Sequence, residues 1–231
     1  MKIARKLLIF SASCFILVLF TGCTLFSHTD PAPEEDIIGF DQMHMANEDV
    51  CAWLSIPGTE LSLPVLQSRN GDDEYYLTHT ANGREDGLGC LFIQQRYNSR
   101  DFTDPVTVIY GRRGSKGELF APLQKLYSEN SSLQSCGEIY VQTSERELRY
   151  QVFASGAYSG MHILYSYDGF RNVEDIPRFL SDFRRYHTMI RQFDDSLAVG
   201  ADDRILILST SLEQDQNQRY LVLAKLIEEI G

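Results

Sequence analysis

Basic residues are scarce in this chain of 231 residues, which has 21 lysines and arginines against 32 aspartates and glutamates. The formal net charge is −11, and three of the bases (Lys2, Arg5 and Lys6) lie in the first 22 residues, which contain no acid. The rest of the chain therefore carries 18 bases and 32 acids, a net charge of −14. Because nucleic-acid binding depends mainly on neutralising phosphates with Lys and Arg, this deficit argues against a DNA- or RNA-binding role.

The chain also lacks the cysteine patterns of metal sites and disulfide frameworks. No CxxC pair and no Cys/His cluster with metal-ligand spacing occurs, so no metal or other cofactor is expected. The three cysteines of the chain body cannot all pair with one another, and we interpret them as small hydrophobic side chains. The five cysteines of the chain are Cys14, Cys23, Cys51, Cys90 and Cys136.

The N-terminus has the features of an export segment. Residues 1–6 are positively charged, and Leu7 to Phe20 is an uncharged apolar run. The tetrapeptide at residues 20–23 resembles a bacterial lipobox, with Phe20 where Leu is usual, and predicts a lipoprotein-type signal peptide at 1–22 and lipidation of Cys23. The alternative is an uncleaved membrane anchor, because Leu7 to Phe26 is uncharged and approaches the roughly 20 residues that span a bilayer. Residues 23–36 are typical of a tether, so either way the domain is expected at the extracytoplasmic face of a bacterial cell membrane.

Residues 37–231 are expected to form one domain, since no internal repeat or low-complexity tract follows residue 36. Eight short runs rich in β-branched and aromatic residues favour a closed barrel or a sandwich. These runs are Trp53–Ile56, Leu61–Leu66, Gly89–Gln94, Val106–Tyr110, Gly137–Thr143, Leu148–Ala154, Arg204–Thr210 and Tyr220–Ala224. Three helices are expected, and apolar residues at helical spacing mark the last of them. The helices are Asp36–Ala46, Lys116–Tyr127 and Val173–Phe193.

Short motifs between Phe40 and Leu226 form an ordered series. They are Asn47, Asp49, Trp53, Ile56, Gly58 and Thr59; Pro64-Val65 with Gln67; Tyr75-Tyr76-Leu77; Gly89 with Leu91-Phe92; Val108-Ile109-Tyr110-Gly111 with Phe120 and Leu123; Ile205–Thr210; and Arg219-Tyr220-Leu221-Val222. In their order and spacing these motifs resemble those of class B sortases. The resemblance implies a mainly β fold, an eight-stranded sortase-type β-barrel with an N-terminal helix and a long helix between two late strands.

The same resemblance identifies three candidate catalytic positions. Sortases are cysteine transpeptidases that cleave the sorting signal of a surface protein and join it to a cell-wall or pilin amine. Their chemistry uses a Cys at the end of an LSTC strand, a His after Tyr-Gly and an Arg on the next strand. The matching positions here are Ser211, Arg112 and Arg219, of which only Arg219 keeps the family residue.

The two replacements remove the reactive groups of that chemistry. A free Cys has a pKa near 8.5 and readily forms a thiolate, whereas a Ser hydroxyl needs an adjacent base before it attacks a carbonyl. Arg112 offers only donors and stays protonated, so it neither accepts a proton from Ser211 nor returns one to a leaving amine. The sequence therefore predicts a sortase-like pseudoenzyme with two guanidiniums and one hydroxyl in its cleft.

Three functions remain open at this point. The first is a non-catalytic cell-surface protein that acts by binding or scaffolding, in which Arg112 and Arg219 hold a carboxylate or the carbonyl end of a sorting-type peptide. Its partner would be a sorting-signal-like peptide, a surface protein precursor or another sortase. The second is a peptidase or transpeptidase that uses Ser211 with a displaced base, for which His162 is the best candidate, although we interpret it as a solvated loop side chain. The third is an assembly module whose cleft has collapsed.

Overall fold

The computed structural model of the chain describes residues 39–186 and 191–231. The predictions for the signal peptide or anchor, for Cys23 and for the tether lie outside these residues. Within them, the strands are β1 Val50–Ser55, β2 Ser62–Leu66, β3 Leu91–Phe92, β4 Val106–Tyr110, β5 Glu138–Gln142, β6 Glu147–Tyr158, β7 Arg191–Phe193, β8 Ile205–Ser211 and β9 Arg219–Ile230. The helices are α1 Phe40–Ala46, α2 Leu123–Leu126, α3 Asn130–Ser135, α4 Ile163–Ser166 and α5 Asp175–Arg185, and the 3-10 turns are η1 Tyr75–Leu77 and η2 Asp168–Phe170.

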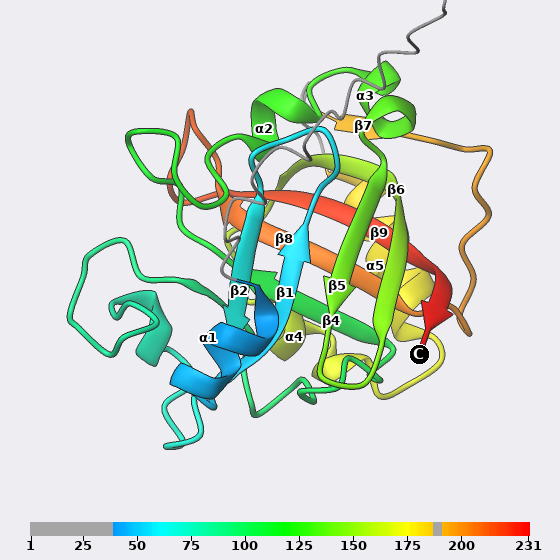
Figure 1. The fold of residues 1–231 in the computed structure, drawn as a ribbon. Helices are drawn as coiled ribbons and strands as arrows, with labels where there is room; N and C mark the ends of the chain where they lie inside the picture. Colours follow the sequence, from blue (N-terminus) through cyan, green and yellow to red (C-terminus); the bar gives the residue numbers. More distant parts are fainter. Residues whose placement is uncertain (1–38, 187–190) are drawn as a thin grey trace, which may run out of the picture. The chain divides into compact units, whose positions relative to one another are not determined.

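The strands of the described residues form one sheet in the order β5-β1-β2-β3-β4-β8-β9-β6-β7. Strand β5 also pairs with β6, so the eight strands from β5 to β6 close into the expected barrel, which is visible in Figure 1. Strand β6 is long enough to pair with β5 along its first half and with β7 along its second. The pairs β2–β3 and β4–β8 are parallel, and the other neighbouring strands run antiparallel.

Alternation along the strands divides the apolar residues between the barrel interior and an outer layer. On β8, Leu206 and Leu208 belong to the interior cluster, whereas Ile205 and Ile207 belong to the cluster beneath α5. This is the two-residue period of a strand buried on both faces. In Figure 1, β8 and β9 cross behind β1 and β2, and α5 lies behind β9.

The helix predicted at Val173–Phe193 is present but shorter. Helix α5 begins at Asp175 and ends at Arg185, because Tyr186 adopts an extended backbone (φ −63°, ψ 114°). Its apolar face buries Ile176, Phe179 and Phe183 against the barrel. Residues 191–193 belong to strand β7 instead, so the helical extension to Phe193 is wrong. Phe193 packs on Phe183, at 5.6 Å between ring centroids. Such a contact is compatible with a helix or with a strand at residues 191–193.

The helix predicted at Lys116–Tyr127 is reduced to the single turn α2 at Leu123–Leu126. Gly117 and Leu119 have positive φ angles of 92° and 50°, which are incompatible with a right-handed helix. The segment before α2 is therefore a loop, and Pro122 opens the helical turn.

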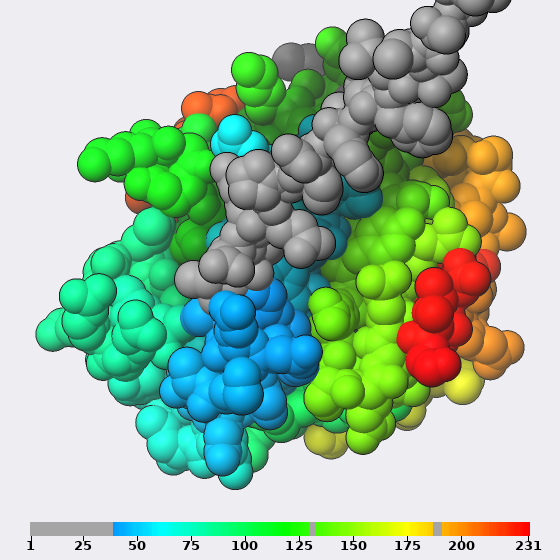
Figure 2. Space-filling view, in the orientation of Figure 1, coloured from blue at the N-terminus to red at the C-terminus, as the bar shows by residue number. Residues whose placement is uncertain are grey.

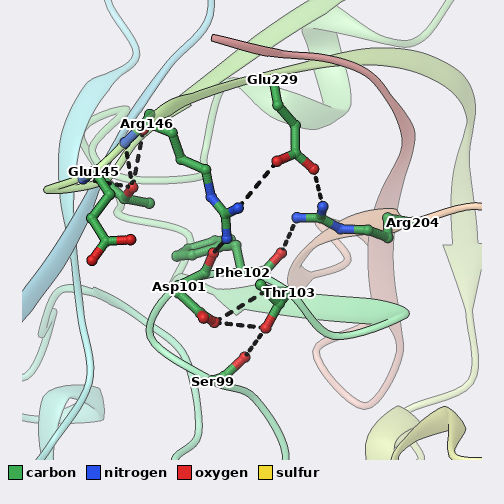
Figure 3. Close-up of polar contacts among 9 residues, drawn as sticks. Ser99, Asp101, Phe102, Thr103, Glu145, Arg146, Arg204 and Glu229 are labelled. Carbon is green, nitrogen blue, oxygen red and sulfur yellow. Dashed lines mark hydrogen bonds and ion pairs between the residues drawn. The ribbon is translucent and has the colours of Figure 1, made fainter. Parts of the chain in front are cut away.

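An ion-pair cluster around Glu229 of β9 joins segments that are far apart in the sequence (Figure 3). Glu229 accepts a hydrogen bond of 3.1 Å from Arg146 in the β5–β6 turn, and it also pairs with Arg204, which precedes β8. Arg146 donates to the carbonyl of Asp101 at 2.9 Å, and Arg204 donates to the carbonyl of Phe102. The cluster thereby holds the end of β9 against the hairpin turn and the loop before β4.

Figure 2 shows the end of β9 beside the β5–β6 hairpin on the surface, in agreement with the pairing of Glu147 with Ile230.

Candidate functional site

Strands β8 and β9 place Ser211 and Arg219 side by side. The two residues are direct cross-strand partners in the antiparallel register. Since Leu208 faces the barrel interior, alternation directs Thr210 inward and directs Ser209 and Ser211 to the outer face. Side chains of a cross-strand pair leave the sheet on the same face, so the hydroxyl of Ser211 and the guanidinium of Arg219 share it.

The end of strand β4 brings Arg112 to the same place. Tyr110 pairs with Ser209 in the parallel register, and the amide of Gly111 donates to the carbonyl of Ser209 at 3.1 Å. A Cβ atom on Gly111 would lie 2.5 Å from a methyl carbon of Leu91, so only glycine fits this turn. Arg112 then leaves the strand and donates through Nε to the carbonyl of Leu77 at 3.1 Å.

These residues open onto one cavity of about 380 Å³. Arg112, Ser211 and Arg219 all line it, together with Tyr110, Gln94 and His162. The fold therefore brings together the three residues singled out in the sequence, although they are up to 107 positions apart. Cys23, the candidate lipidation site, lies outside the described residues.

The two guanidiniums of the cavity have no carboxylate partner among residues 39–186 and 191–231. No ion pair there involves Arg112 or Arg219, whereas the adjacent Arg113 pairs with Glu213 of the β8–β9 loop. Within the same part of the chain, the hydroxyl of Ser211 makes no hydrogen bond to another residue. The cavity thus presents two unneutralised cations around an unassisted hydroxyl.

His162 is half-buried at the cavity wall, so our interpretation of it as a solvated loop side chain is wrong. Its Nδ1 accepts a hydrogen bond of 3.1 Å from the amide of Tyr165, which caps the short helix α4. Its Nε2 lies 2.8 Å from the Oε1 oxygen of Gln94. Because Nδ1 is the acceptor, the proton of the neutral ring is on Nε2 and is donated to Gln94. Burial lowers the pKa of His162.

We expect His162 to be neutral, with its proton on Nε2, at pH 7. A pKa below the ordinary value of 6.5 means that the unfolded chain binds the proton more readily, so the stability contributed by the neutral ring is complete above pH 6.5 and falls as the pH drops below it. Two-dimensional ¹H–¹⁵N spectra of the imidazole across pH 4–8 measure the midpoint and the tautomer. The same spectra of the urea-unfolded chain are the control, and a folded midpoint at or above the unfolded one would contradict the assignment.

Tyr110 is a residue of the site that the sequence marked only as part of a motif. Its hydroxyl is buried and has no hydrogen-bond partner within the described residues. Burial raises the pKa of this hydroxyl, and the positive charge of Arg219 opposes the rise. Its ring stacks on Phe92 at 5.5 Å. No sequence pattern marks Tyr110 as a residue of the cavity. The strand register, which aligns it with Ser209, is what places it there.

The thiols of the described residues lie elsewhere. Cys51, Cys90 and Cys136 are free, and none lines the cavity. Burial raises the pKa of Cys51 to about 12 and that of Cys90 to about 11, values that disfavour the thiolate. Cys51 is buried as expected, while Cys90 and Cys136 are partly exposed.

No group of three or more His, Cys, Asp or Glu side chains in the described part of the chain is arranged to hold a metal ion. No helix in residues 39–186 or 191–231 combines the length and the apolar character needed to cross a membrane.

Comparison with known proteins agrees with this architecture. No protein-family model matches the chain. It is 28% identical over 186 residues to sortase B of Listeria monocytogenes, which covers 78% of this chain and 71% of the relative. It is 25% identical over 191 residues to sortase B of Staphylococcus aureus, which covers 82% of this chain and 75% of that protein.

Solved structures show the same fold. A Staphylococcus aureus sortase B–substrate complex superposes with a TM-score of 0.68 at 24% identity, covering 82% of this chain and 84% of that one. A Streptococcus pyogenes class B sortase involved in pilus biogenesis gives a TM-score of 0.66 at 22% identity, covering 81% of this chain and 97% of that one. The closed eight-stranded barrel, the motif series and these relatives together make the chain a class B sortase-like protein.

Proposed function

We propose that this sortase-fold protein acts at the cell surface by binding a sorting-signal-like peptide and does not carry out acyl transfer. The observation that carries the proposal is the content of the cavity: a hydroxyl at residue 211 and a guanidinium at residue 112, where sortase motifs place a thiol and an imidazole. A guanidinium has a pKa above about 12 and has no lone pair available to take a proton. Within the described residues, the hydroxyl of Ser211 forms no hydrogen bond to a group that could act as its base.

The enzyme alternative needs a base within about 3 Å of the hydroxyl of Ser211. His162 lines the same cavity, but the amide of Tyr165 occupies its Nδ1, and its Nε2 proton points to Gln94. To act as a base on Ser211, the ring would have to break the cap of α4. These contacts support the binding function over a displaced catalytic base.

The assembly alternative requires a closed cleft with neutralised arginines. The cavity instead has a volume of about 380 Å³, and neither Arg112 nor Arg219 pairs with an acid of the described residues. An open, cationic cavity in a chain of net charge −11 supports ligand binding more than packing. The partner would be a surface protein precursor or a working sortase, at the extracytoplasmic side of the membrane that the N-terminal apolar run predicts.

The proposal predicts binding without turnover. Full-length protein in a mild nonionic detergent is incubated with a fluorescent sorting-signal peptide of a class B sortase and an amine nucleophile, and an active class B sortase is assayed in parallel. We expect a saturable rise in fluorescence anisotropy and no cleaved or transpeptidated product by mass spectrometry. Turnover that Ser211→Ala abolishes would reject the proposal in favour of the serine-dependent enzyme.

A further inference from the structure

We propose that the cavity is specific for the free C-terminal carboxylate of a peptide, in preference to an uncharged carbonyl within a chain. This inference rests on the proposed peptide-binding function and names the chemical class of its ligand. Such a ligand is the acid that remains when a peptide bond has been hydrolysed, so the protein would bind cut peptides more tightly than intact ones.

The first argument is the unbalanced charge. Arg112 and Arg219 point into one cavity from the ends of β4 and β9, and no ion pair neutralises either within the described residues. Other arginines of this acidic chain do find acids, including Arg113, the immediate neighbour of Arg112. Two like charges in one cavity repel each other, and a bound anion removes that repulsion, whereas a neutral carbonyl does not.

The second argument is geometric. The Nε of Arg112 is held by the carbonyl of Leu77 at 3.1 Å, so its two terminal nitrogens are the donors left for a ligand. Arg219 stands beside Ser211 as its cross-strand partner. A carboxylate has two oxygens that accept several hydrogen bonds each, and two guanidiniums lining one cavity supply donors for both of them. An amide carbonyl offers a single oxygen and leaves one guanidinium unused.

Tyr110 lines the same cavity, but its hydroxyl is not a donor for the ligand. The hydroxyl is shut off from solvent and has no hydrogen-bond partner among the described residues. Tyr110 leaves strand β4 two residues before Arg112, and its register partner Ser209 is two residues before Ser211. We therefore assign recognition of the carboxylate to the two guanidiniums.

One acid also lines the cavity and opposes the binding of an anion. Glu74 is exposed and forms no ion pair with either guanidinium within the described residues. Its side chain therefore lowers the affinity of the cavity for a carboxylate without occupying the guanidiniums. With both arginines exposed to solvent, we expect a modest affinity that falls as salt is added.

The test uses minimal probes that carry no sorting sequence. N-acetylglycine supplies a peptide-like free carboxylate, and N-acetylglycinamide has the same shape without the charge. Each is titrated into ¹⁵N-labelled full-length protein in nonionic detergent, and the Nε–H resonances of the arginines are followed. We expect saturable shifts of Arg112 and Arg219 with the acid and affinity for the acid at least about tenfold above that for the amide.

Matched variants separate this site from general attraction to positive charge. Arg112→Gln and Arg219→Gln should each weaken binding of the acid about tenfold. Arg84→Gln is the control, because Arg84 is also exposed and has no acidic partner within the described residues, yet it does not line the cavity. Equal affinity for acid and amide, an equal loss in Arg84→Gln, or no shift of Arg112 and Arg219 would overturn the inference.

A second comparison distinguishes failure of this inference from failure of the proposed function. The sorting-signal peptide is trimmed to end at the residue before its scissile bond and is made as the free acid and as the carboxamide. We expect the acid to bind at least about tenfold more tightly. If both forms bind equally, the cavity is a peptide site without carboxylate specificity. If neither binds, the peptide-binding function itself is rejected.

Discussion

Replacing Arg112 with His and Ser211 with Cys in the same chain should create thiol-dependent cleavage of a sorting-signal peptide, at a rate at least about 100-fold above that of the unmodified protein. The gain has two physical sources. A thiol ionises near pH 8.5, and the neighbouring guanidinium of Arg219 favours its thiolate. An imidazole at residue 112 both accepts and donates a proton near neutral pH, and general acid–base catalysis of this kind typically contributes 10²–10⁴-fold.

The single variants are the controls, since Arg112→His leaves the weak nucleophile and Ser211→Cys leaves no base. Product formation is followed by mass spectrometry at pH 7 with and without iodoacetamide. The native thiols Cys51, Cys90 and Cys136 lie outside the cavity, and the Arg112→His variant, which keeps all three, controls for their contribution. A double variant that retains the circular dichroism of the parent and yet cleaves nothing would show that the cavity no longer holds a scissile bond between residues 112 and 211.

Truncation of Phe179 should be the most destabilising of the simple substitutions on α5. The ring is fully buried and meets Tyr158, Tyr167 and Phe170 with centroid separations of 5.7, 5.3 and 5.6 Å, in edge-to-face contacts. Phe179→Ala removes those contacts and leaves a cavity beneath the helix, which typically costs about 3–5 kcal/mol of the free energy of unfolding. Urea denaturation followed by circular dichroism measures the loss.

Val173→Ala provides the comparison, because Val173 is 67% exposed and its truncation should change the free energy of unfolding by less than about 0.5 kcal/mol. The segment that packs on Phe179 also carries His162, so we expect Phe179→Ala to weaken the hydrogen bond between His162 and Gln94 as well. A loss below about 1 kcal/mol would mean that α5 does not hold this wall of the cavity.

The strands were predictable where local pattern and pairing agree. The barrel core is encoded by runs such as Val106–Tyr110, whose predicted bounds match β4. Two strands are longer than their predicted runs. Strand β6 continues through 155–158, which pair with the start of β9, and β9 continues through a mixed polar and apolar segment to Ile230, which pairs with Glu147. Strand β7 was missed, since three residues give too short a pattern and its pairing with β6 is decided by tertiary structure.

Some residues of the site were predictable from the sequence and others were not. Motif order was enough to single out Arg112, Ser211 and Arg219, and the fold places all three on one cavity. His162 was singled out as the best candidate for a displaced base, and it does line the cavity. Its contact with Gln94 was not predictable, because it joins residues 68 positions apart in two loops. The ion pairs of Glu229 were also not predictable from the sequence. Arg146 and Glu229 are 83 positions apart, and no sequence pattern indicates which base a surface acid will pair with.

Strand β9 lies between β8 and β6, and both of its edges are hydrogen-bonded. A nascent chain that has not yet emerged past residue 219 therefore presents two open apolar strand edges, one on each side of the gap that β9 will fill. Exposed edges of that kind template wrong pairings with other chains. A chain in which β9 is missing or unpaired is therefore expected to aggregate more readily than the complete barrel.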